Sequence, residues 1–239
     1  MKNIKNRIFI KKKLNLKDRI NLDIDQIHYL RNVLRTKTND NVSIFNDELV
    51  CFTRVVDITK NSCELEIIEY EHIKKEDHSI TLFFSPIKRT PLEIMIQKCT
   101  EIGVSTFQPV IMKRTNMKNI NFKRLNLIAI EACEQSNRNI IPVIHKPISF
   151  DSMIKSDSLH NYLYCSLNGD KHKIRNRNLL RNDGIGIIIG PEGDFTPDEY
   201  KNLKSKKKSF GISLGSNILK SETAAITASS IIMDEIYNA

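Results

Sequence analysis

The sequence lacks tryptophan and has only five cysteines and eight glycines among its 239 residues. The cysteine count is odd and no two cysteines form a C-x-x-C pair, which argues against a disulfide framework and against a zinc knuckle. No group of His, Cys, Asp or Glu has the spacing of a metal site, so we expect no metal ion. Free thiols are typical of proteins in a reducing cytosol.

Long apolar runs are also missing. No run approaches the roughly 20 residues that a helix needs to cross a bilayer. The N-terminus is basic like a signal peptide, but residues 8–10 are followed at once by three lysines at 11–13, so it has no apolar h-region. The sequence therefore predicts a cytoplasmic protein without a membrane segment.

Two common nucleotide-binding motifs do not occur. The sequence contains neither G-x-G-x-x-G nor G-x-x-x-x-G-K-[ST]. These absences disfavour a nucleotide-dependent oxidoreductase and give no support to a P-loop enzyme.

Positive charge is abundant. There are 37 Lys and Arg against 28 Asp and Glu, a net charge of +9. Residues 1–19 hold eight basic side chains and one acid, Asp18, and a second basic patch contains Lys113, Arg114, Lys118, Lys123 and Arg124. Because basic side chains on phosphates release condensed counterions, this distribution favours a polyanionic partner.

The first 72 residues are predicted to form a small β-barrel domain. Period-two patterns and turn residues predict one helix over residues 25–35 and strands over 7–10, 42–45, 49–59 and 63–70. In the helix, Ile27, Leu30, Val33 and Leu34 share one face. A polar stretch over 71–78 is the candidate linker to a second domain, 73–239.

From residue 79 strands alternate with helices, which predicts an α/β domain with a mainly parallel sheet. Two capping boxes, Thr90-Pro91-Leu92-Glu93 and Thr196-Pro197-Asp198-Glu199, predict helix starts, and Gly103 predicts a helix end. The expected strands are 80–85, 106–112, 141–144, 162–166, 184–189 and 209–214, and further helices are expected over 122–138, 150–155 and 221–237.

Two glycine turns follow two of these strands. Gly190-Pro191-Glu192-Gly193 separates an aliphatic strand from a capped helix, and Leu214-Gly215 precedes the last helix. Glycine lets the backbone approach a ligand closely, and a helix N-terminus offers free N–H groups. We expect the two turns to lie side by side at the carboxyl edge of the sheet, where ligands bind in such folds.

Five segments in this order resemble the RsmE family, the ribosomal small-subunit RNA uridine-N3 methyltransferases of the SPOUT superfamily. They are residues 28–35 (HYLRNVLR), 97–104 (QKCTEIGV), 131–142 (EACEQSNRNIIP), 189–193 (IGPEG) and 214–225 (LGSNILKSETAA). The resemblance implies a PUA-like RNA-binding barrel and a methyltransferase domain with a deep trefoil knot, one of the rare exceptions to unknotted topology. It also implies S-adenosylmethionine as cofactor, a homodimer, and methylation of N3 of a uridine in 16S ribosomal RNA of the small subunit.

The resemblance further implies roles for particular residues. The expected cofactor-binding residues are Leu167, Gly190, Glu192, Gly193, Leu214, Gly215, Ile218, Leu219, Thr223 and Ala224. The expected RNA-binding residues are Arg7, Arg31, Arg35, Lys88, Arg114 and Lys220.

Two residues are catalytic candidates. Arg138 would stabilise the N3 anion or hold a phosphate; the alternative is a helix-end arginine paired with Glu134. Glu192 would orient the base or the cofactor amine; the alternative is an acid favoured by the helix dipole, as for Glu222.

The sequence departs from the family pattern at three positions. Asp194 replaces a glycine, and Asn217 and Lys220 replace arginines. Lysine keeps the charge but loses the planar fork of arginine, so these changes bear mainly on RNA contacts. The alternatives that the sequence leaves open are a non-catalytic RNA-binding protein of the same fold and a SPOUT methyltransferase that acts on another RNA.

Overall fold

The computed structural model describes residues 6–14, 19–74, 78–117, 119–159, 161–170 and 184–237. The chain forms two compact units. The N-terminal unit comprises Met1–Lys75 and Cys133–Ile141, and the C-terminal unit comprises Glu76–Ala132 and Pro142–Ala239. The segment Cys133–Ile141 therefore packs with the first 75 residues, although it begins within the last turn of a helix, Phe122–Ser136, that starts in the C-terminal unit.

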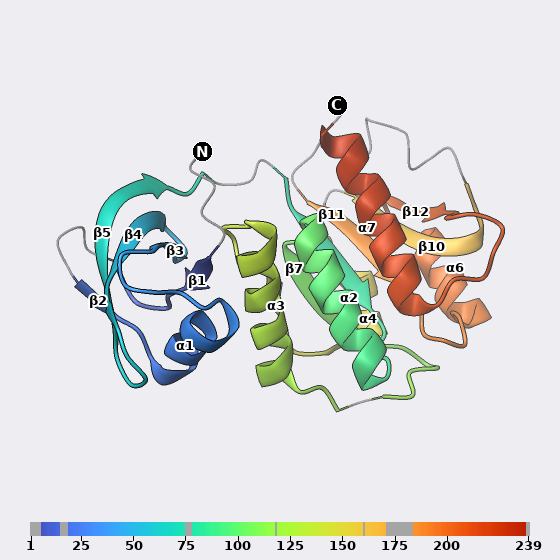
Figure 1. Cartoon of the computed structure of the whole chain (residues 1–239). Coiled ribbons are helices and arrows are strands. Elements are labelled where there is room, and N and C mark those ends of the chain that lie inside the picture. Colours follow the sequence, from blue (N-terminus) through green and yellow to red (C-terminus); the bar gives the residue numbers. More distant parts are fainter. Residues whose placement is uncertain are drawn as a thin grey trace. The chain divides into compact units, whose positions relative to one another are not determined.

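The N-terminal unit is a curled five-stranded sheet in the order β1-β3-β4-β5-β2 (Figure 1). Strands β1 and β3 are parallel, and the other neighbours are antiparallel. The strands are β1 (Arg7–Phe9), β2 (Arg19–Asn21), β3 (Asn41–Phe45), β4 (Leu49–Ile58) and β5 (Cys63–His72). One face of this sheet buries an apolar core that includes Ile8, Ile27, Leu30, Val42, Ile44, Cys51, Val55 and Leu65.

The helix predicted over 25–35 is present over residues 24–33, but only its first part is an α-helix. An α-helix, α1 (Ile24–His28), begins with a capping box between Asp23 and Gln26, and it continues as a π-helical turn, η1 (Tyr29–Val33). The wider turn changes which side chains face inward, because it has more residues per turn than an α-helix. Ile27 and Leu30 are buried as predicted, whereas Val33 is 60% exposed.

Arg7 lies inside the N-terminal unit. Its guanidinium donates to the carbonyl of Arg138 (3.5 Å) and to Oδ1 of Asn139 (2.6 Å), and it lies 4.5 Å from the centroid of the Phe45 ring. Burial lowers the pKa of Arg7, opposed by the nearby Cys133 and Glu134. These contacts attach the 133–141 segment to β1, and an RNA contact by Arg7 remains a prediction.

The C-terminal unit has a sheet in the order β12-β10-β11-β6-β7-β8, with β9 paired to β7. Every pairing in it is parallel, which confirms the predicted α/β class. The strands are β6 (Ile80–Phe84), β7 (Thr106–Ile111), β8 (Val143–Ile144), β9 (Ile148–Ser149), β10 (Asn161–Asp170), β11 (Ile185–Ile189) and β12 (Ser209–Ile212).

Helices cover both faces of this sheet (Figure 1). They are α2 (Arg89–Ile102), α3 (Phe122–Ser136), α4 (Phe150–Lys155), α6 (Pro197–Ser205) and α7 (Ser221–Tyr237). Alternate residues of β11 enter two cores, because neighbouring side chains of a strand point to opposite faces. Ile187 and Ile189 pack with side chains of α2, α3 and α7, and Ile188 packs with side chains of α4 and α6.

The start of α2 differs from the prediction. The helix begins at Arg89, and its N-cap Lys88 has no side-chain cap. Glu93, which was expected to complete a capping box with Thr90, instead pairs with Arg89 at 2.8 Å. The end of the helix is as predicted, because Gly103 is the C-cap, with φ of 122°.

Replacing Gly103 with alanine is expected to lower stability by about 1–2 kcal/mol, because an L-residue is strained at positive φ. A Cβ there would also lie 2.7 Å from Cε of Met233, a flexible side-chain end that can move. Thermal denaturation measures the effect, and the melting temperature should fall by several degrees. An unchanged melting temperature would contradict the assignment of Gly103 as a strained helix cap.

Candidate functional site

The loop from β11 to α6 forms the first wall of a pocket. It turns at Gly190-Pro191-Glu192-Gly193, where the amide of Asp194 donates to the carbonyl of Pro191 at 2.9 Å. A Cβ on Gly190 would lie 3.1 Å from the Phe195 ring, so the turn packs closely on this ring. The predicted capping box at the start of α6 is confirmed.

Glu199 stabilises the loop between β11 and α6 through hydrogen bonds. It is 3% exposed, and its carboxylate accepts hydrogen bonds from the amide of Lys113 (2.8 Å) and from the amide and hydroxyl of Thr196 (2.8 and 3.0 Å). The contact with Lys113 joins the segment after β7 to the start of α6. The next residue, Arg114, donates to the carbonyl of Gly193 at 2.6 Å.

Replacing Glu199 with leucine is expected to destabilise the protein by about 2–3 kcal/mol, because it leaves three partly buried donors without their acceptor. Glu199→Gln keeps an acceptor oxygen and should cost less than half as much. Chemical denaturation of both variants measures the difference. Equal stability of the leucine variant and the wild type would show that these hydrogen bonds do not support the loop.

The loop from β12 to α7 forms the opposite wall. Gly215 has φ of 134°, and a Cβ placed on it would meet no atom within 4 Å. Ser213 stabilises the turn through a hydrogen bond from its hydroxyl to the carbonyl of Gly215 (3.2 Å). The hydroxyl of Ser221, the first residue of α7, donates to the carbonyl of Gly190 at 3.2 Å, so the two glycine turns are held together.

Strand β10 lies between these two loops. The two strands that precede the glycine turns are not neighbours, because β10 pairs with β11 on one side and β12 on the other. The two turns still meet at the carboxyl edge, and β10 supplies the floor between them with Cys165, Ser166 and Leu167. Burial raises the pKa of Cys165 to about 12, so this side chain is a neutral thiol.

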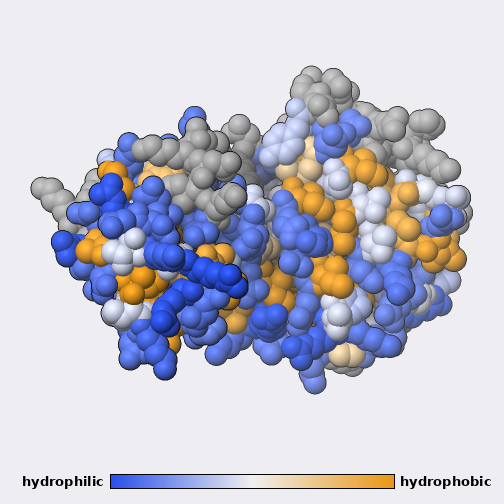
Figure 2. Space-filling model, in the orientation of Figure 1, coloured by the Kyte–Doolittle hydropathy of each residue, from blue (hydrophilic) through white to orange (hydrophobic). Residues whose placement is uncertain are grey.

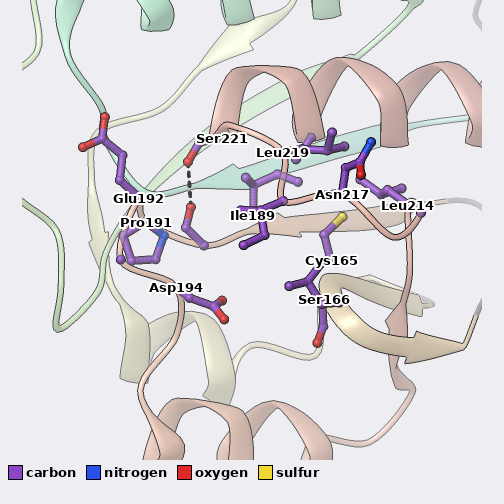
Figure 3. A pocket seen from close by; sticks show the side chains of 16 residues that line it. Cys165, Ser166, Ile189, Pro191, Glu192, Asp194, Leu214, Asn217, Leu219 and Ser221 are labelled. Atoms are coloured by element: carbon purple, nitrogen blue, oxygen red, sulfur yellow. Dashed lines mark hydrogen bonds between the residues drawn. The ribbon is translucent and has the colours of Figure 1, made fainter.

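Together the three segments enclose a pocket of about 340 Å³ (Figure 3). This volume is within the range of small-molecule sites. The lining residues are Cys165, Ser166, Leu167, Ile189, Gly190, Pro191, Glu192, Gly193, Asp194, Leu214, Gly215, Asn217, Ile218, Leu219, Ser221 and Ala224. Nine of the ten residues predicted to bind cofactor are among them; Thr223 is exposed and is not.

The pocket combines apolar walls with acidic side chains. The charged residues among those that line it are Glu192 and Asp194. In Figure 3 the Glu192 side chain points away from the centre, whereas those of Asp194 and Ser166 border the same space. An apolar site with carboxylates suits a ligand that has an apolar aromatic part and a positive charge.

The other predicted residues lie outside the pocket lining. Five of the predicted RNA-binding residues are exposed: Arg31, Arg35, Lys88, Arg114 and Lys220. Arg138, the first catalytic candidate, is 9% exposed and belongs to the N-terminal unit. Lys118, part of the second basic patch, lies outside the described residues.

Over the residues that the structure describes, no three His, Cys, Asp or Glu side chains come together in a group that could hold a metal. Within those same ranges, no helix has the length and apolarity to cross a membrane.

Comparison with known proteins identifies the class of this protein. Residues 74–233 match the family model of the RNA methyltransferase domain, and residues 22–68 match that of the RNA methyltransferase PUA domain. The fold is thus that of an RNA methyltransferase with a SPOUT-type methyltransferase domain and an N-terminal PUA domain, a curled half-barrel.

The chain belongs to the ribosomal RNA small subunit methyltransferase E family. It is 37% identical to the ribosomal RNA small subunit methyltransferase E of Rickettsia conorii, over 93% of each chain. The structure of the same enzyme from Neisseria gonorrhoeae, bound to S-adenosyl methionine, is 28% identical, with a TM-score of 0.84 over 94% of this chain and 95% of that one. A methyltransferase of Legionella pneumophila in complex with the cofactor is 25% identical, with a TM-score of 0.85 over 95% of this chain and 96% of that one.

Proposed function

We propose that this protein binds S-adenosylmethionine in the pocket between the β10, β11 and β12 loops and methylates N3 of a uridine in 16S ribosomal RNA of the small subunit. The observation that carries the proposal is the convergence of nine predicted cofactor-binding residues on one pocket. The relatives from Rickettsia conorii and Neisseria gonorrhoeae are ribosomal RNA small subunit methyltransferases, and the Neisseria and Legionella structures hold S-adenosylmethionine.

The residues that line the pocket fit this cofactor. Adenine would lie between apolar side chains such as Leu214, Leu219 and Ala224, with its edge on backbone groups of the β12–α7 loop. Gly215 leaves open space where any side chain would begin. When bound, the cofactor supplies an electrophilic methyl group, and the protein supplies orientation and electrostatics.

The site must also act on the proton at N3 of the uridine. N3 of uridine carries a hydrogen, so the site has to remove it or stabilise the anion that forms. Arg138 is proposed to stabilise that anion, and Glu192 to orient the base or the cofactor amine. The carbonyl of Arg138 accepts from the buried Arg7, which supports the backbone at this position.

The RNA would be held by the PUA domain and by exposed basic residues of both units. The exposed candidates are Arg31, Arg35, Lys88, Arg114 and Lys220. Arg7 remains a candidate, although its guanidinium is engaged inside the N-terminal unit. Further parts of the proposal are a boundary between domains 1–72 and 73–239, a trefoil knot around the cofactor site and a cytoplasmic location.

We also propose a homodimer. Figure 2 shows hydrophobic side chains gathered over α2 and α7. Ile94 of α2 is 43% exposed, and Ile226, Ile231 and Ile236 of α7 are only partly buried. An exposed apolar surface of this kind is typical of protein interfaces.

Calorimetric titration with S-adenosylmethionine, with NADH as a control, tests the cofactor. Binding of the first alone is expected. Incubation with small ribosomal subunits and labelled cofactor, followed by mass spectrometry of digested 16S RNA, then tests the reaction. Absence of cofactor binding, alone or with subunits added, would refute the enzyme proposal and favour a non-catalytic RNA-binding protein.

A further inference from the structure

Asp194 is the residue of the pocket whose backbone is least suited to its side chain. Its φ is 63°, in the left-handed region where glycine is favoured, and glycine is the residue that the family pattern has here. A non-glycine residue in this region costs roughly 1 kcal/mol, although aspartate tolerates it better than most. Backbone strain of this kind at a ligand pocket points to a functional role of the side chain.

The Asp194 carboxylate is held in one orientation. Oδ1 accepts the amide hydrogen of Phe195 at 2.8 Å, and both oxygens lie 3.0 Å from the hydroxyl of Tyr200. The Tyr200 hydroxyl is also 3.4 Å from Oγ of Ser166, which lines the pocket floor. The Tyr200 ring packs against the rings of Phe195 and Tyr164, with centroids 5.2 and 6.3 Å away.

This arrangement leaves the carboxylate ready to bind a cation. Burial, together with Asp194, raises the pKa of Tyr200, so its hydroxyl stays a neutral donor at physiological pH. A carboxylate has about four acceptor positions, and the hydrogen bonds from Phe195 and Tyr200 leave at least one for a ligand. The side chain is exposed and borders the pocket beside Ser166 (Figure 3).

We infer that Asp194, positioned by Tyr200, binds the α-ammonium group of S-adenosylmethionine and sets the preference of the pocket for ligands that carry this group. The inference rests on the proposed function, because it assigns one contact within the same site. Charge-assisted hydrogen bonds between ammonium and carboxylate are about twice as strong as neutral ones.

The cofactor carries a second cation, its sulfonium. The chemistry of methyl transfer disfavours a contact between Asp194 and this group. The sulfonium loses its charge as the methyl group leaves, so a carboxylate in contact with it would stabilise the ground state more than the transition state. The ammonium keeps its charge throughout the reaction. A carboxylate on the ammonium therefore strengthens binding at no cost to the rate of methyl transfer.

The test is calorimetric titration of Asp194→Asn with three ligands at neutral pH. S-adenosylmethionine has both cations, S-adenosylhomocysteine keeps only the ammonium, and 5′-methylthioadenosine has neither. Affinity for the first two should fall by about tenfold or more, and affinity for the third should change less than about twofold. Asp194→Gly, which relieves the backbone strain, should give the same pattern, and Tyr200→Phe a weaker form of it.

Asp198→Asn is the matched control, since Asp198 is exposed at the start of α6 and does not line the pocket. It should leave all three affinities unchanged. Weakening of S-adenosylmethionine alone would assign Asp194 to the sulfonium and overturn the inference, as would equal weakening of all three ligands or of none. Failure of the wild type to bind S-adenosylmethionine would instead refute the proposed function, and the inference with it.

Discussion

Replacing Arg138 with alanine is expected to lower methyl-transfer turnover by about a hundredfold or more while cofactor affinity stays nearly unchanged. Removal of one preorganised donor to a developing anion costs this much in other enzymes. Cofactor affinity should be retained because Arg138 is not among the residues that line the pocket. Single-turnover methylation of small ribosomal subunits measures the rate, and calorimetry measures cofactor binding.

Two variants separate a catalytic role of Arg138 from a structural one. Arg138→Lys keeps the charge but loses the planar fork, so it should recover only part of the rate. Arg54→Ala is the matched control, because Arg54 is an exposed arginine of β4 in the same unit. Wild-type turnover in Arg138→Ala would remove this residue from the site.

Sequence patterns confined to neighbouring residues predicted the ends of several helices correctly. The bounds predicted for α4 and α7 agree with the structure, and the Thr196-Glu199 box starts α6 as predicted. The same signal failed at Thr90, because Glu93 is drawn to Arg89 one helical turn away. A capping motif thus predicts a helix start only where no competing partner is available to the acidic residue.

Two short strands, β2 and β9, were not predicted from periodicity, although β1 and β8 were. Strands β2 and β9 have three and two residues, too few for an alternating pattern, and they exist because they pair with β5 and β7. The π-helical turn after α1 was also missed, since the apolar spacing of residues 27–34 fits an ordinary helix. These features depend on the tertiary structure.

The pocket shows the same division between local and tertiary information. The glycine turns were visible in the sequence, but the insertion of β10 between β11 and β12 was not, because strand order is not encoded in spacing. Cys165 and Ser166 therefore had no signal other than their closeness to Leu167. The positive φ of Asp194 likewise appears only in the structure, although its replacement of a glycine was apparent.

Replacing Gly215 with valine is expected to weaken S-adenosylmethionine binding by about a hundredfold or more. At φ of 134° a β-branched residue is severely strained, so the free loop would relax to another conformation that binding must reverse. The new side chain would also extend into the open space that borders the pocket. Each effect is worth about 1–2 kcal/mol, and their sum corresponds to the expected loss of affinity.

Ser216→Val is the matched control for Gly215→Val. Ser216 is the next residue of the same loop, it is exposed, and it is not among the lining residues. Calorimetry should show S-adenosylmethionine binding within about threefold of wild type for Ser216→Val. The melting temperature of Ser216→Val should change little, because Ser216 is exposed and belongs to neither core of the C-terminal unit. Equal affinities of the two variants would show that the conformation of Gly215 does not shape the cofactor site.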